Sequence, residues 1–162
     1  MPSIEEALTP SFDRVTEYSE AVLRLTSSGY ALWDILESSV RAGSLDSAIK
    51  KGSERPADIR RFVKEYPTVR RIVFATGKGS AAKFKKHFLA WLQEGGFVSH
   101  ESGIEVFGAQ GKLPLAPLAD VEAKEKIELI VPPSVSPACA AIPVAEKIRV
   151  WKEIVFNVPA GP

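Results

Sequence analysis

The chain contains few of the residue types that build covalent cross-links or metal centres, although it has 162 residues. Its single cysteine, Cys139, excludes a disulfide within one chain and favours a reducing compartment. The two histidines, His87 and His100, do not show the spacing of zinc ligands. We therefore expect neither a disulfide framework nor a metal site.

Long apolar runs are also missing, so no segment is long enough to span a membrane. The first six residues, MPSIEE, lack the basic start and apolar stretch of a secretory signal. Neither a Walker A loop nor a Gly-x-Ser-x-Gly nucleophile elbow is present. From these absences we expect a cytoplasmic or nuclear protein that does not bind membranes.

The overall charge is small, but basic residues cluster in one part of the chain. Hydrophobic residues make up 45% and charged residues 25% of the sequence, which is ordinary for one soluble globular domain. The net charge is only +1, yet residues 60–87 contain nine Lys and Arg against one acid, Glu65. Such a basic block is typical either of a nucleic-acid contact or of a solvated helix face.

Hydrophobic spacing predicts helices and short strands that alternate along the chain. Helices are predicted at residues 10–27, at 56–66, between the turn at 76–79 and Gly95, and around residues 144–155. Strands are predicted at residues 71–75 and 127–131, and a hairpin at 97–107. Residues 38–55 are expected to form a loop with a short helical turn, and 112–118 a connector. This alternation indicates an α/β fold.

Two loops follow the predicted strands, and ligands of α/β sheets gather at the carboxyl ends of strands. In the 76–80 loop, Gly77 and Gly79 allow close backbone approach, and the helix start that follows suits phosphate. The 132–139 loop contains three prolines, which stiffen it, and two hydroxyls, Ser134 and Ser136, that can bond phosphate oxygens. On local sequence alone, an ordinary strand-to-helix connector is the favoured interpretation of both loops.

Several segments, taken in order, resemble one family. They are GYALWDIL at 29–36, RAGSLDSAI at 41–49, VFATGK at 73–78, AAKF at 81–84, PSVSPACA at 133–140, and the final helix with Trp151. Together they resemble the hypoxanthine-DNA (deoxyinosine) glycosylases of the uracil-DNA glycosylase superfamily over residues 18–154, with an interruption at about 95–126.

The resemblance implies a three-layer α/β sandwich around a short, mainly parallel sheet. Residues 1–158 would form a single domain, altered or enlarged at about 95–126, with a tail at 159–162. It implies hydrolysis of the N-glycosidic bond of a deaminated base, flipped out of double-stranded DNA, with no metal or organic cofactor. The implied DNA-binding residues lie in the two loops and the following helix: Gly77, Lys78, Lys83, Ser134, Ser136, Pro137 and Cys139.

Three departures from the family pattern concern the active site. No counterpart is present for the first strand, its Gly-Ser-x-Pro-Gly loop and the Asn-x-Phe-Trp segment with the catalytic asparagine. Thr76 and Cys139 occupy positions where the family has asparagines. The chain is a fragment, or residues 97–107 rebuild the sheet, or the fold is altered. The catalytic group is therefore unknown, and Asp34 and Asp46 are the only candidates we name.

Three hypotheses follow for the function. The chain is a glycosylase that excises hypoxanthine or uracil, or a degenerate glycosylase-like module that binds DNA or a protein partner without cleavage. The third is an unrelated α/β domain that binds an anion at Gly77–Ser80. Salt-dependent DNA binding and base release distinguish them. A sheet that lacks a central strand also favours self-association.

Overall fold

The computed structural model describes residues 17–108 and 126–156, in two compact units, Met1–Asp34 and Ile35–Pro162. In the first unit, helix α2 (Tyr18–Ser27) ends at Gly29, whose φ of 84° lets the Tyr30 N–H reach the Leu25 carbonyl. The predicted helix at 10–27 is therefore confirmed over residues 18–27. Residues 10–16, the connector at 112–118 and the tail at 159–162 lie outside the described residues.

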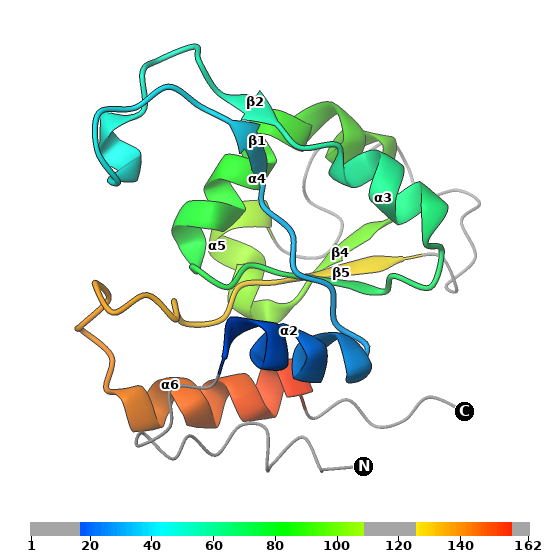
Figure 1. The fold of residues 1–162 in the computed structure, drawn as a ribbon. Helices are drawn as coiled ribbons and strands as arrows, with labels where there is room; N and C mark the ends of the chain where they lie inside the picture. The colour runs from blue at the N-terminus through cyan, green and yellow to red at the C-terminus, as the bar shows by residue number, and fades with distance from the viewer. Residues whose placement is uncertain (1–16, 109–125, 157–162) are drawn as a thin grey trace. The chain divides into compact units, whose positions relative to one another are not determined.

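The second unit is built on a three-stranded parallel sheet. Strand β5 (Ile127–Ile130) lies between β3 (Arg71–Val73) and β4 (Phe97–Ser99), giving the order β3-β5-β4 (Figure 1). Both neighbours pair with β5 in parallel. The α/β class, the two predicted strands and the short parallel sheet are thus confirmed.

The predicted hairpin at residues 97–107 is wrong. Only β4 is extended there, and it is followed by a 3-10 turn, η2 (Glu101–Gly103), and a short helix, α5 (Ile104–Phe107). Helix α4 (Lys78–Glu94) returns the chain to the amino ends of the strands, so β4 enters parallel to β5. Phe107 is buried in the core and holds α5 in place. Residues 97–99 thus add a strand to the sheet.

The segment before β3 also differs from the prediction. Arg55–Pro56 form strand β2, which pairs antiparallel with β1 (Leu36–Ser38), so Pro56 does not begin a helix. Helix α3 (Ile59–Glu65) begins three residues later, because the Asp58 side chain accepts a hydrogen bond from the Arg61 N–H at 3.1 Å. The expected short helical turn is present as η1 (Asp46–Ala48).

Helical segments cover both faces of the sheet. Ile127, Leu129 and Val131 share one buried cluster with Phe84 and Phe88 of α4. Successive strand residues point to opposite faces, so Glu128 and Ile130 point away from this cluster. On that other face lie α6 (Val144–Trp151) and the π-helical turn η4 (Lys152–Phe156), which confirm the predicted last helix (Figure 1).

Arg71 connects the elements on this second face of the sheet. Its guanidinium donates to the carboxylate of Glu128 at 3.2 Å and to the carbonyls of Val155 and Ile154 at 2.7 and 2.5 Å. The carbonyls at the end of a helical segment have no partner within it, so a part-buried cation is a favourable cap. One side chain therefore joins β3, β5 and η4.

We expect Ile130→Val to lower the free energy of unfolding by about 1 kcal/mol, because it removes one methylene from a fully buried site. Ile104→Val makes the same change at a side chain that is 44% exposed, and we expect a smaller loss. Urea unfolding of both variants checks this. Equal losses would contradict the placement of Ile130 in the core.

Candidate functional site

Two loops meet at the carboxyl edge of the sheet, after β3 and after β5. The Val135 N–H donates at 3.0 Å to the carbonyl of Ala75, the residue just before the 76–80 loop, and within the loops Gly77 lies against Ser134. Because β3 and β5 are parallel, both loops open at the same edge, as the sequence predicts. Their contact defines the candidate site.

Gly77 allows the two loops to approach this closely. Its φ of 74° and ψ of −146° lie in a region that is essentially restricted to glycine. A Cβ there would lie 3.3 Å from the Ser134 nitrogen and 3.4 Å from the Pro132 carbonyl oxygen. The residue thus serves both purposes that the sequence assigns to a glycine: an unusual turn and close backbone contact.

Helix α4 begins directly after Gly77 and is oriented toward this edge. The Ser80 hydroxyl donates to the Gly77 carbonyl at 2.9 Å, and the Ala81 N–H donates to the same oxygen at 3.2 Å. The first backbone N–H groups of a helix have no partner within it and carry partial positive charge. This end of α4 therefore presents hydrogen-bond donors beside the 132–139 loop.

The side-chain oxygens of the two serines in the 132–139 loop accept hydrogen bonds from backbone N–H groups of the same loop. The Ser134 oxygen accepts from the Ser136 N–H at 3.1 Å, and the Ser136 oxygen accepts from the Ala138 N–H at 3.3 Å. Within the described part of the chain, neither hydroxyl donates to another group. Each keeps its O–H as a donor, which matches a ligand rich in acceptor oxygens.

Helix α6 holds the 132–139 loop from the other side. The Trp151 indole N–H donates to the Pro133 carbonyl at 2.8 Å. The Lys147 ammonium donates to the carbonyls of Cys139 at 2.7 Å and Ser136 at 3.3 Å. Three carbonyls of the loop thus face α6, and the loop has a fixed shape.

The lysines that the resemblance assigns to DNA binding both pair with acids. Lys78 bonds to Glu105 of α5, and Lys83 bonds to Asp46 of η1 at 2.9 Å. The Lys78–Glu105 pair is exposed, with 65% and 71% of the two side chains accessible, whereas the Lys83 side chain is only 21% exposed. Exposed pairs contribute 0 to about 1 kcal/mol, so a phosphate can compete for Lys78 more easily than for Lys83.

Most cations of the basic block bond to a carboxylate or a backbone carbonyl. Of its nine cations, Arg61 and Lys64 alone lack a bonding partner among residues 17–108 and 126–156. The partners of the other seven are Glu94 for Arg60, the Pro67 carbonyl for Arg70, Glu128 for Arg71, Glu105 for Lys78, Asp46 for Lys83, the Val106 carbonyl for Lys85 and Glu54 for Lys86. The block therefore mainly connects α3, β3 and α4 to their neighbours.

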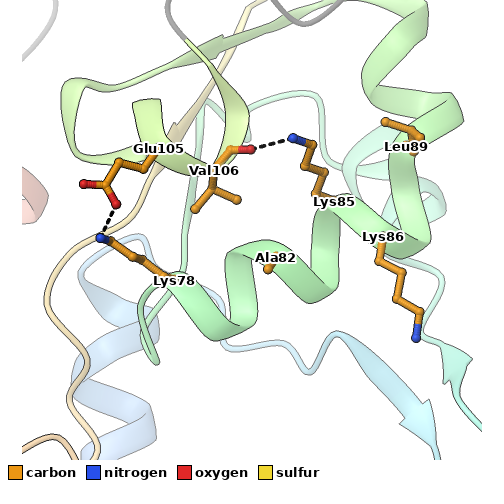
Figure 2. Close-up of a pocket in the computed structure, with 7 residues that line it drawn as sticks. All are labelled: Lys78, Ala82, Lys85, Lys86, Leu89, Glu105 and Val106. Atoms are coloured by element: carbon orange, nitrogen blue, oxygen red, sulfur yellow. Dashed lines mark hydrogen bonds and ion pairs between the residues drawn. The ribbon is translucent and has the colours of Figure 1, made fainter. Parts of the chain in front are cut away.

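A shallow hollow lies between α4 and α5, with a volume of about 520 Å³. Figure 2 shows its residues: Lys78, Ala82, Lys85, Lys86, Leu89, Glu105 and Val106. The lysines at its rim are those that bond to Glu105, to the Val106 carbonyl and to Glu54. Lys78 and Lys86 are thus paired with carboxylates, whereas Lys85 bonds to a neutral carbonyl.

The two acidic candidates belong to different compact units. Asp46 contacts Lys83 and Arg41, each at 2.9 Å, and the hydrogen bond from Lys83 is the main reason why its pKa lies below the usual aspartate value. Asp34 belongs to the first compact unit. Of the residues that the sequence proposes for the site, the structure brings Gly77 and Ser134 together. It places Asp46 in an ion pair with Lys83 of α4.

The sequence did not point to three further residues at this edge. Ser102, just after β4, accepts a hydrogen bond from the Val131 N–H at 3.1 Å, and the His100 Nδ1 lies 2.8 Å from its hydroxyl. Lys147 is the third. The only available signal was position: His100 and Ser102 follow an apolar strand, and Lys147 lies one turn before Trp151.

Three further findings concern membranes, metals and similar proteins. Within residues 17–108 and 126–156, no helix is long and apolar enough to cross a membrane. The same residues contain no group of three or more His, Cys, Asp or Glu arranged to hold a metal ion. No family model, curated protein or solved structure matches the chain.

We expect Gly77→Ala to cost about 1–3 kcal/mol of folding free energy, because the backbone conformation and the adjoining Ser134 both oppose a Cβ. Gly79→Ala is the control, since its Cβ would meet nothing within 4 Å. A helical alanine there should add up to about 1 kcal/mol. Thermal unfolding of both variants measures the difference, and similar effects would contradict the contact between the loops.

We expect the pKa of Asp46 to lie below the ordinary aspartate value and to rise toward it in Lys83→Met, because the main hydrogen bond is removed. The associated stability is present above the ordinary pKa and is lost as the pH falls through the folded pKa. Side-chain carboxyl NMR shifts against pH measure this. Lys85→Met, an equal charge change on α4, should leave the Asp46 pKa unchanged. A raised pKa in the wild type would contradict the ion pair.

Proposed function

We propose that this chain is a glycosylase-like module, related to the uracil-DNA glycosylase superfamily, that binds double-stranded DNA without excising a base. The observation that supports it best is the meeting of the 76–80 and 132–139 loops at the carboxyl edge of a parallel sheet. The helical segments on both faces of that sheet suit the three-layer arrangement that the resemblance implies.

The donors at this edge match the chemistry of a phosphate backbone. The O–H groups of Ser134 and Ser136, the first N–H groups of α4 and the ammonium of Lys78 are all donors. Phosphate oxygens only accept, and hydroxyls, helix N-termini and lysines are common phosphate contacts in DNA-binding proteins. Pro137 and Cys139 complete the loop that would enter the duplex.

The ion pairs of the acidic residues near the site favour binding without cleavage. Asp46 and Glu105, the two carboxylates that contact the proposed phosphate-binding lysines, are both engaged in ion pairs. A carboxylate with a lowered pKa is a weak general base, so Asp46 is poorly suited to activate water. Cys139 provides a weak donor where the resembled motif has an asparagine.

The experiment compares duplexes that contain deoxyinosine, deoxyuridine or only normal bases. Gel shifts at several salt concentrations measure binding, and single-turnover incubation followed by alkaline strand cleavage measures base release. We expect binding that weakens steeply with salt and no strand cleavage above background. Cleavage would make the chain an active glycosylase, and Asp46→Asn and Asp34→Asn would then be compared for loss of base release.

One pair of variants locates the DNA contact. We expect Lys78→Gln to reduce the slope of log affinity against log salt by about 1, since one phosphate contact is lost. Lys64→Gln removes the same charge from α3, outside both loops, and should leave the slope unchanged. Equal effects would place the DNA elsewhere, and no binding by the wild type would favour a protein partner instead.

A further inference from the structure

Lys147 is a buried lysine, with 9% of its surface exposed, and it is the one buried charged or polar side chain among the described residues. Its ammonium has two partners, the carbonyl oxygens of Cys139 and Ser136. Within the described part of the chain it forms no ion pair. Buried charges are usually paired with an opposite charge, so this one needs a separate explanation.

The two carbonyls accept hydrogen bonds from two of the three N–H groups of the ammonium, and their dipoles do not cancel its charge. A positive charge of reduced hydration therefore lies directly beneath residues 136–139, where the interior screens it less than water would. The same bonds draw the loop carbonyls toward α6. The carbonyls of Pro133, Ser136 and Cys139 are thus turned toward α6, while the hydroxyl donors of Ser134 and Ser136 have no described partner.

We propose that Lys147 is the positioning residue of a phosphate subsite on the 132–139 loop. This assignment rests on the proposed DNA binding. The ammonium holds the loop carbonyls away from the ligand, and its charge attracts one phosphate of the duplex on the outer side of the loop. The negative charge that Lys147 lacks in the free chain is supplied by the DNA.

Trp151 provides the matched control, because it bonds to the same loop from the same helix without a charge. Trp151→Phe removes the bond to the Pro133 carbonyl and keeps Lys147. Lys147→Met removes the charge and both bonds, and Lys147→Arg keeps the charge and the donors. All are compared in the full chain by gel shift on the normal duplex from low to high salt, with thermal unfolding as a check of folding.

We expect Lys147→Met to weaken binding at least tenfold at low salt and to flatten the salt slope. Lys147→Arg should restore most of the affinity. Trp151→Phe should weaken binding by a smaller factor with an unchanged slope, since a structural loss alone does not alter the number of ions released. A folded Lys147→Met that binds within twofold of the wild type, with the same slope, overturns the assignment while the proposed DNA binding stands.

A measurement on the wild type covers the case in which Lys147→Met does not fold. Titration of the ¹⁵N-labelled chain with duplex DNA should shift the amide signals of Ser134, Val135, Ser136, Ala138, Cys139 and Lys147. Shifts elsewhere, with these signals unmoved, would overturn the subsite but not DNA binding. No shifts at all would overturn the proposed function together with the assignment.

Discussion

The parallel pairing of β3 with β5 is the constraint on which the rest of the second unit depends. Its register sets Arg71 beside Glu128 and Val73 beside Ile130, so the segments that follow each strand leave the sheet at the same level. The contact between Gly77 and Ser134 follows from that register, and so does the reach of Arg71 to the end of η4. A shift of this register would separate the two loops and would also move Arg71 away from the carbonyls at the end of η4.

The sequence correctly predicts the elements that have strong local signals. Its predictions are wrong where contacts between distant residues determine the conformation. The apolar runs at 71–75 and 127–131 and the inner face of α4 are sufficient to place β3, β5 and the main helix, but not β4. The turn-like Glu101–Gly103 stretch suggests a hairpin, but its conformation is set by the bond between Ser102 and Val131, 29 positions away. By its local sequence, Pro56 can begin a helix or belong to a strand. Only the pairing of β2 with β1 determines that it lies in a strand.

In the candidate site, too, the features with local sequence signals are predictable and those set by distant contacts are not. The two loops are predictable because parallel strands end at one edge, and both glycine and small polar residues mark them. The partners of the charged residues are not predictable, because Lys83 with Asp46 and Lys78 with Glu105 join residues 37 and 27 positions apart. Lys147 resembles an ordinary exposed lysine in the sequence, and its burial depends on how α6 lies against the loop.

The strand order has a consequence for how the chain folds. The central strand β5 is the last of the three to leave the ribosome, after β3, α4 and β4. Until residues 127–130 arrive, neither edge strand has its partner, and the apolar face of α4 has only part of its cover. Sheet formation therefore requires contacts between residues that are distant in sequence, and such contacts form more slowly than local ones.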